Sequence, residues 1–158
     1  MPIEAFDAHD HQGCITNGLA SAEDACTRNG LQFTPVRRRV LEILLGEHVA
    51  LGAYDILDRL RAEGLGSQPP VVYRALDFLV THGFAHRIER LNAFIACSHV
   101  GAGHTPAFLI CRGCKRVVEA EADPNVGELA RAAASAGFVI ERIVREAEGL
   151  CPGCVETA

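Results

Sequence analysis

The sequence predicts an α+β protein, in which a helical N-terminal domain ending in a β-hairpin is followed by a small α/β domain. Three observations support this prediction. Up to residue 83, apolar residues recur at helical spacing in short segments that glycines close. The pattern then changes to the alternation typical of strands. A glycine-rich stretch, residues 98–107, separates the two halves and is predicted to be a hinge.

Residues 1–20 are polar and contain glycines, which indicates a flexible lead. Within the lead, His9, His11 and Cys14 are residue types that could bind metal, but the sequence shows no fixed partner for them. We therefore interpret the segment as a solvated tail. A further group is interpreted as structural: the histidines His48 and His82, and a small buried thiol, Cys26.

Four short helices are predicted between residues 21 and 83, each with explicit start and stop signals. The first is expected to start at Ser21, where "SAED" resembles a capping box, and to stop at Gly30. The second has Thr34 as its N-cap and Gly46 after its end. The third and fourth follow, and the fourth begins at two prolines and closes at Gly83.

A β-hairpin is predicted after the fourth helix, with strands over residues 84–89 and 93–97 around the turn "RLN". Three helices followed by a two-stranded wing match a winged helix-turn-helix, whose last helix enters the major groove of DNA. The net charge of -5 excludes a generally basic surface. A DNA contact would instead use a focused patch such as Arg28 with the arginines at 37–39. Residues 21–97 are therefore a candidate DNA-binding domain.

Residues 108–158 read as a small α/β unit. The pattern predicts strands over residues 108–111 and 116–121, a helix over 124–136 and a further strand over 138–146. A unit of this size has a small core, so a bound metal and dimerisation would both help to stabilise it.

The cysteines indicate a metal site, and this interpretation depends on the cellular compartment of the protein. No apolar run reaches the roughly 18 residues of a membrane span, and the N-terminus lacks the features of a signal peptide, so we expect a cytoplasmic protein without membrane contact. In a reducing compartment, cysteines serve more often as metal ligands than in disulfides. Four of the seven form two CxxC pairs, Cys111 with Cys114 and Cys151 with Cys154. Such pairs supply the ligands of a closed, structural zinc site, and this reading is favoured over a redox pair.

A site of four cysteines leaves no coordination position for Glu119, which lies among valines. Glu119 is then either a residue at the edge or surface of a sheet or a member of a second site. Its candidate partners are His86, Cys97 and a hinge histidine, His99 or His104. A mixed site at the junction of the two domains would make their orientation depend on metal, as a sensor requires.

Four stretches together resemble the ferric uptake regulator family of bacterial metal-sensing repressors: "FTPVRRRVLEIL", "PPVVYRALDFLVTHGFAHRIE", "CRGCKRVVE" and "GLCPGC". The resemblance covers roughly residues 20–156 and is greatest to the zinc-sensing branch. It implies a homodimer, with N-terminal winged-helix domains and C-terminal dimerisation domains, that binds a palindromic operator in double-stranded DNA when zinc is bound. The expected function is repression of zinc uptake genes.

The resemblance also implies roles for individual residues, and two Zn²⁺ ions per chain. The structural zinc would be held by Cys111, Cys114, Cys151 and Cys154. The regulatory zinc would be held by His86, Cys97, His104 and Glu119, with His104 preferred over His99 on motif position. DNA would be contacted by Tyr54, Tyr73 and Arg74. Asp58 and Arg61 match positions that pair neighbouring dimers on DNA.

Two other functions compete with this one. An iron- or peroxide-sensing member of the family would release DNA on iron loss or on oxidation of Cys97 or a CxxC pair, but the hinge lacks the histidine run of such members and a thiolate ligand favours zinc. A zinc hydrolase or thiol oxidoreductase would need a base and nucleophile arrangement that the sequence does not show. We therefore expect no enzymatic activity.

Overall fold

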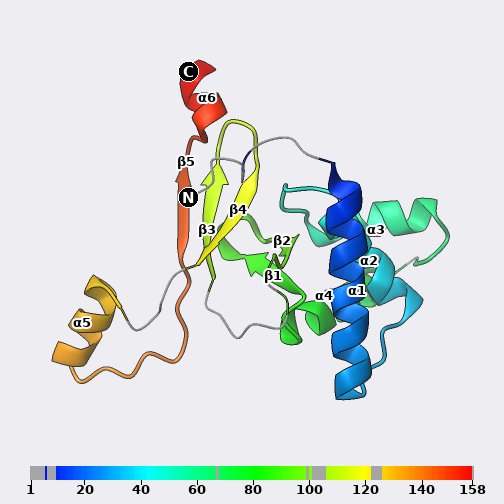
Figure 1. Ribbon diagram of the computed structural model, residues 1–158, viewed down its shortest axis with the longest axis horizontal. Coiled ribbons are helices and arrows are strands. Elements are labelled where there is room, and N and C mark those ends of the chain that lie inside the picture. The colour runs from blue at the N-terminus through cyan, green and yellow to red at the C-terminus, as the bar shows by residue number, and fades with distance from the viewer. Residues whose placement is uncertain are drawn as a thin grey trace.

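The computed structural model describes residues 6, 10–66, 68–98, 100, 106–121 and 126–157. Four helices form one side of the molecule, a two-stranded hairpin follows them, and a three-stranded sheet lies beyond the hairpin (Figure 1). The fold is α+β, as predicted. Within the described residues, none of the helices combines the length and the apolar character of a membrane span.

The first helix, α1 (His11–Asn29), begins well before Ser21, where the sequence predicted its start. The Asp10 carboxylate caps it by accepting a hydrogen bond of 3.0 Å from the backbone N–H of Gln12. Buried residues of α1 such as Leu19 pack into the helical core. Reading residues 1–20 as a flexible lead was therefore wrong for residues 11–20, because packing against α2 overrides the local capping signal.

Helices α2 (Pro35–Leu45), α3 (Ala53–Ala62) and α4 (Pro69–Thr81) lie where the sequence predicted them. The Thr34 side chain accepts a hydrogen bond from the N–H of Arg37 at 3.3 Å, which caps α2. Their inner faces form the main core, with these side chains almost fully buried: Val40, Leu41, Leu44, Ile56, Leu57, Leu60, Val72, Leu76 and Leu79.

The hairpin consists of β1 (Ala85–Ile88) and β2 (Ala93–Ala96), which pair antiparallel around a short 3-10 turn, η2 (Glu89–Leu91). Leu51 adds a bridge to Phe94 through backbone hydrogen bonds of 2.9 and 2.8 Å. The helices and this wing give the winged helix-turn-helix arrangement that the sequence predicted, with α4 directly before the wing.

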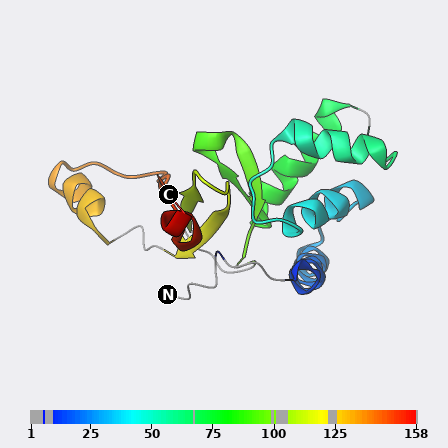
Figure 2. The ribbon, with the colours of Figure 1, turned by 90° about the horizontal axis from the view of Figure 1, so that it is seen from above.

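The C-terminal unit has a sheet of order β4-β3-β5, made by β3 (Pro106–Cys111), β4 (Val117–Glu121) and β5 (Glu146–Gly149). Strand β3 pairs antiparallel with β4 and parallel with β5. Helices α5 (Glu128–Ser135) and α6 (Pro152–Thr157) complete the unit, and α5 lies on an arm away from both sheets (Figures 1 and 2).

The strand predicted over residues 138–146 is not formed at residues 138–145, and β5 begins only at Glu146. Alternating apolar residues favour a strand, but a strand also needs a partner edge, and this chain supplies one only near the second CxxC pair. As a result Phe138 and Val139 are 67% and 80% exposed.

A second apolar cluster joins the wing to the C-terminal sheet. Ile88 and Ile95 from the hairpin pack with Phe108, Ile110 and Val117 from β3 and β4, and all five are buried. The predicted hinge at residues 98–107 lies mostly outside the described residues, and its last two residues, Pro106 and Ala107, belong to β3. The cluster shows that the two units pack directly against each other.

Candidate metal centres and DNA-facing residues

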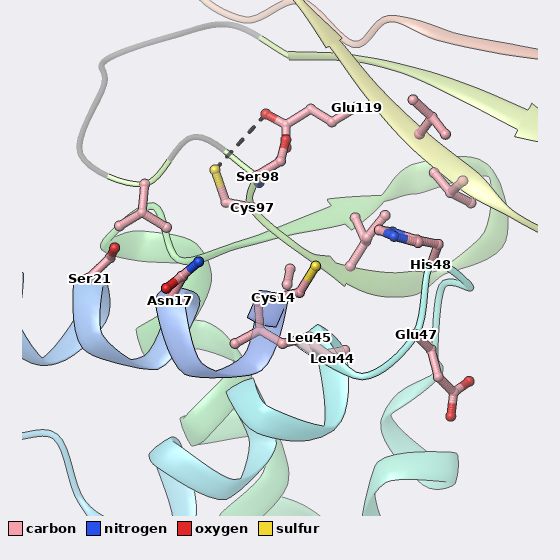
Figure 3. Close-up of a pocket in the computed structure, with 16 residues that line it drawn as sticks. Cys14, Asn17, Ser21, Leu44, Leu45, Glu47, His48, Cys97, Ser98 and Glu119 are labelled. Atoms are coloured by element: carbon pink, nitrogen blue, oxygen red, sulfur yellow. Dashed lines mark hydrogen bonds between the residues drawn. The ribbon is translucent and has the colours of Figure 1, made fainter. Parts of the chain in front are cut away.

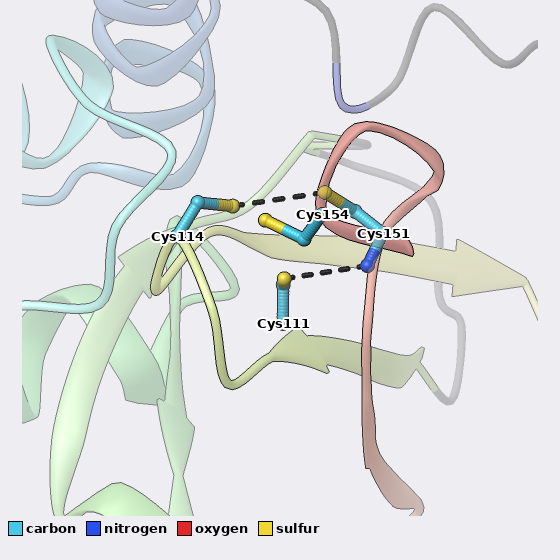
Figure 4. A group of neighbouring side chains, drawn as sticks. All are labelled: Cys111, Cys114, Cys151 and Cys154. Atoms are coloured by element: carbon cyan, nitrogen blue, oxygen red, sulfur yellow. Dashed lines mark hydrogen bonds between the residues drawn. The ribbon is translucent and has the colours of Figure 1, made fainter. Parts of the chain in front are cut away.

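The two CxxC pairs come together at one end of the C-terminal sheet (Figure 4). The four sulfur atoms of Cys111, Cys114, Cys151 and Cys154 all lie within 4.8 Å of one another. The backbone N–H of Cys151 donates to the Cys111 sulfur at 3.3 Å, and the sulfurs of Cys114 and Cys151 are 3.8 Å apart. The spacing in the sequence predicted this grouping, and the tetrad matches the donor set of a tetrahedral zinc site.

The local backbone explains how the two pairs meet. Pairing of Cys111 with Gly149 in the parallel ladder of β3 and β5 carries the chain after β5 over the first CxxC turn. That turn requires a glycine, because a Cβ at Gly113 would lie 2.9 Å from the Cys154 sulfur. Lys115 follows with a φ of 67°, a left-handed conformation that closes the turn.

The electrostatics of the tetrad call for a cation. Backbone N–H groups, first that of Cys114 and then that of Cys151, lower the pKa of the Cys111 thiol to about 6. Hydrogen bonds with the sulfurs of Cys151 and then Cys111 raise the pKa of Cys154 to about 12. Four neighbouring sulfurs cannot all become thiolates unless a positive charge lies between them, which a zinc ion supplies.

A second group forms where the wing meets the C-terminal sheet, and Figure 3 shows two of its members, Cys97 and Glu119. His86 from β1, Cys97 after β2 and Glu119 from β4 bring their donor atoms within 4.8 Å of one another. The Glu119 Oε1 atom lies 3.3 Å from His86 Nε2 and 4.0 Å from the Cys97 sulfur. Nitrogen, sulfur and oxygen donors thus come from both structural units and share one point, as expected for a mixed metal site.

Glu119 is no surface residue, since its side chain is only 3% exposed. Its second oxygen, Oε2, accepts hydrogen bonds of 3.0 Å from both the backbone N–H and the hydroxyl of Ser98. Ser98 therefore orients the carboxylate toward Cys97 and His86, a role that the sequence did not indicate. The other proposed ligand, His104, and its alternative, His99, lie outside the described residues.

Two carboxylates of β5 hold the wing at a second place. The Glu146 carboxylate accepts hydrogen bonds from the backbone N–H groups of Glu89 at 2.6 Å and Arg90 at 2.9 Å. The Arg90 guanidinium pairs with both oxygens of Glu148 at 3.0 and 3.2 Å, and this contact lowers the pKa of Glu148. We call Arg90, Glu146 and Glu148 the wing clamp. Sequence reasoning missed it because it depends on which residues the β3–β5 register brings to the wing.

The residues predicted to contact DNA lie on the surface of the helical unit. Tyr54, at the start of α3, is 63% exposed, and Tyr73, in α4, is 44% exposed and is followed by the exposed Arg74. Asp58 and Arg61 are also exposed on α3, with 3.9 Å between their charged groups. The exposed positions of these residues are consistent with a contact surface, and their roles stay predictions.

The arginine patch predicted near residues 28–39 is largely engaged within the protein. Arg39 forms a bidentate pair with Glu63 at 2.6 and 2.7 Å, which raises the pKa of the arginine and lowers that of the glutamate. Arg38 pairs with Glu23, and the Arg37 guanidinium lies 3.9 Å from the centre of the Phe78 ring. The patch is therefore less positive than its sequence indicates.

A winged helix joined to an α/β unit, with one group of metal ligands inside that unit and another at the junction, is the organisation of a metal-responsive DNA-binding regulator. The comparisons with known proteins agree. The chain is 40% identical over 139 residues to the "zinc uptake regulation protein" of Escherichia coli (strain K12), which covers 87% of this chain and 81% of that protein. The protein of the same name from Shigella flexneri matches to the same extent.

Solved structures give the same result. A "zinc uptake regulator complexed with zinc and DNA" superposes with a TM-score of 0.83 at 39% identity, covering 90% of this chain and 96% of that one. Holo XcZur gives 0.78 at 39% identity, covering 89% and 98%. Apo XcZur, also 39% identical and covering 90% and 99%, gives only 0.52. No family model matches the chain.

The chain belongs to the ferric uptake regulator family and, within it, to the zinc uptake regulators.

Proposed function

We propose that the protein is a zinc-responsive transcriptional repressor of zinc uptake genes, which binds a palindromic operator as a zinc-loaded homodimer. The observation that carries this proposal is the group of His86, Cys97 and Glu119, which takes ligands from the winged helix and from the C-terminal unit. A metal bound there fixes the orientation of one unit relative to the other.

In this proposal each chain holds two zinc ions. The first is bound by Cys111, Cys114, Cys151 and Cys154 and stabilises the C-terminal unit. The second is the sensing ion, bound by His86, Cys97 and Glu119 with a fourth ligand from the hinge, His104, or His99 in its place. Because a thiolate is among the donors, zinc is favoured over the harder iron and manganese ions.

The similarity to solved structures supports a zinc-dependent change of arrangement. XcZur is the same relative in both of its forms, yet this chain matches the holo form at a TM-score of 0.78 and the apo form at 0.52. The chain also matches the zinc- and DNA-bound regulator at 0.83. The arrangement described here is therefore more similar to the holo form of XcZur than to its apo form, which supports the proposal that the two units close on the sensing group when zinc binds.

Dimerisation through the C-terminal unit is supported by apolar side chains that a single chain leaves open to water. Large apolar side chains exposed on one segment favour a partner, and a second copy of the chain would form a self-complementary interface with them. The exposed residues are Val126, Leu129, Phe138, Val139 and Val144. Two copies would present two α4 helices to successive major grooves of one palindrome, with Tyr73 and Arg74 toward the DNA and Tyr54 nearby.

The DNA-binding proposal is tested with the full-length protein and a random duplex library selected for binding in the presence of zinc. We expect selection of a palindrome, binding that is lost with a zinc chelator, and recovery when zinc returns. Equal affinity with and without zinc would refute the zinc-sensing role. Release of DNA by dilute peroxide at saturating zinc would instead favour a peroxide sensor. As a protein that acts on bacterial DNA, it would work in the cytoplasm. We propose no enzymatic activity for it.

A further inference from the structure

A third group of metal-ligating side chains lies where the first turn of α1 meets the loop between α2 and α3. His11 and Cys14 are three residues apart in α1 and so share one face of the helix. His48, in the loop, lies opposite them, with its ring centre 4.8 Å from that of His11. The His48 side chain extends toward Cys14, and both line the same cavity (Figure 3).

Close packing of α1 on the end of α2 creates this group. Gly18 permits the approach, because a Cβ at that position would lie only 2.6 Å from Leu45 Cδ2. One turn earlier, Ile15 packs at the helical core, and a Cβ on Gly46 would lie 3.9 Å from its Cδ1 atom. The first turn of α1 is thereby held beside the residues that follow α2, which include His48.

The chemistry of the group suits a borderline divalent cation. Imidazole nitrogens and thiolates are both donors that zinc binds in proteins, and Co²⁺ binds to the same kinds of donor. All three residues are partly buried. Their donor atoms do not all lie within 4.8 Å of one another, unlike those of the two groups described above. Metal binding therefore requires side-chain rotation. The adjoining cavity, about 420 Å³ in volume, provides the space.

We propose that His11, Cys14 and His48 bind a third divalent metal ion, with water completing its coordination. Binding releases the thiol proton of Cys14. Cys97 and Glu119 of the sensing group line the same cavity, but the proposed ligand set shares no residue with that group, and the two are linked through β4. The carbonyl oxygen of His48 accepts a hydrogen bond of 2.7 Å from the N–H of Val117, two residues before Glu119. An ion here anchors α1 and the loop against the strand that carries the sensing carboxylate.

The test uses full-length protein that carries Cys97→Ser and Glu119→Gln and keeps zinc in its four-cysteine site. Co²⁺ is titrated into this protein, and the thiolate-to-cobalt absorption and the cobalt content per chain are measured. We expect one Co²⁺ per chain with a thiolate band. Adding Cys14→Ser should abolish the band, and adding His48→Ala should weaken binding by about tenfold or more.

Two controls separate this site from others. Cys26→Ser removes the other thiol outside the two groups, which is buried at 2% exposure, and it should leave the band unchanged. His82→Ala removes a histidine that packs on Phe78 at the end of α4, and it should leave the affinity unchanged. The proposal is overturned if the starting protein binds no Co²⁺, or if its thiolate band survives Cys14→Ser or is lost with Cys26→Ser. Because two of the proposed sensing ligands, Cys97 and Glu119, are replaced throughout, none of these outcomes bears on zinc-dependent DNA binding.

Discussion

Replacing Glu119 with glutamine removes one negative charge from the proposed sensing site and leaves the shape of the side chain unchanged. Glutamine can keep its carbonyl oxygen toward Ser98, where Oε2 now accepts two hydrogen bonds of 3.0 Å. Its NH₂ group then faces His86 and Cys97. Both ends of the buried amide therefore retain partners, so we expect the variant to fold and to keep zinc in the four-cysteine site.

The loss of zinc affinity at the sensing site should be large. Removing a group that only orients a metal ligand lowers affinity by about 10–100-fold. Glu119 is itself a proposed ligand and its carboxylate is 3.3 Å from the His86 nitrogen, so at least the upper end of that range applies. A 100-fold loss corresponds to about 2.8 kcal/mol. The zinc concentration that gives half-maximal DNA binding should rise by the same factor.

The assay is fluorescence anisotropy of a selected duplex at buffered free zinc concentrations. The matched control is Glu47→Gln, the same chemical change at another residue of the cavity lining, whose side chain points away from Cys97 toward an ion pair with Arg59 at 2.7 Å (Figure 3). We expect the control to respond to zinc like the unaltered protein. If Glu119→Gln shows the same zinc midpoint as the control, Glu119 is not a sensing ligand and the proposed site must be redrawn.

Three further predictions concern the regions around this site. Cys154→Ser should lose the structural zinc, and with it much of the roughly 10–16 kcal/mol of folding free energy that such sites contribute. Thermal unfolding followed by circular dichroism would show the loss, and an unchanged melting temperature would contradict a structural role for Cys154. Arg90→Ala opens the wing clamp at Glu148 and should raise the zinc midpoint for DNA binding a few-fold, with an unchanged midpoint counting against the clamp. Phe138→Glu should weaken the dimer by about 2 kcal/mol or more, because Phe138 is exposed in the single chain. Sedimentation would show this as a rise in the dissociation constant, and an unchanged constant would place the interface elsewhere.

The sequence predicted those elements whose signals are local. Helix α2 follows from its cap at Thr34, and α4 from two prolines at its start and from Gly83 after its end. The start of α1 was missed because it depends on how Gly18 fits against Leu45, a contact between residues far apart in the sequence. Alternation alone could not reveal that residues 138–145 lack a strand partner within the chain.

The same distinction applies to the sites. The CxxC spacing predicted the ligand set of the four-cysteine site. The two thiols of each pair lie close together in sequence, so their proximity does not depend on the rest of the fold. Sequence reasoning named His86 among several candidate partners of Glu119, but it left a surface position for Glu119 open, since the approach of the two residues depends on how the wing packs on β4. Ser98 and Glu146 carried no signal, because each acts through a hydrogen bond whose partner is set by tertiary packing.

If both groups bind zinc as proposed, their positions along the chain predict that only one of them acts as a switch. The four cysteines lie within one structural unit, so zinc there would bind equally well whether the two units are open or closed. A ligand with equal affinity for two states shifts nothing, however tightly it binds. The proposed ligands His86, Cys97 and Glu119 come from both units and meet where the wing packs on β4. Moving the population of closed molecules from about 1% to about 99% needs about 5.5 kcal/mol of difference in zinc-binding free energy between the open and closed states. The apolar cluster of Ile88 and Ile95 and the wing clamp both favour the closed state, so the difference that zinc binding must supply is smaller.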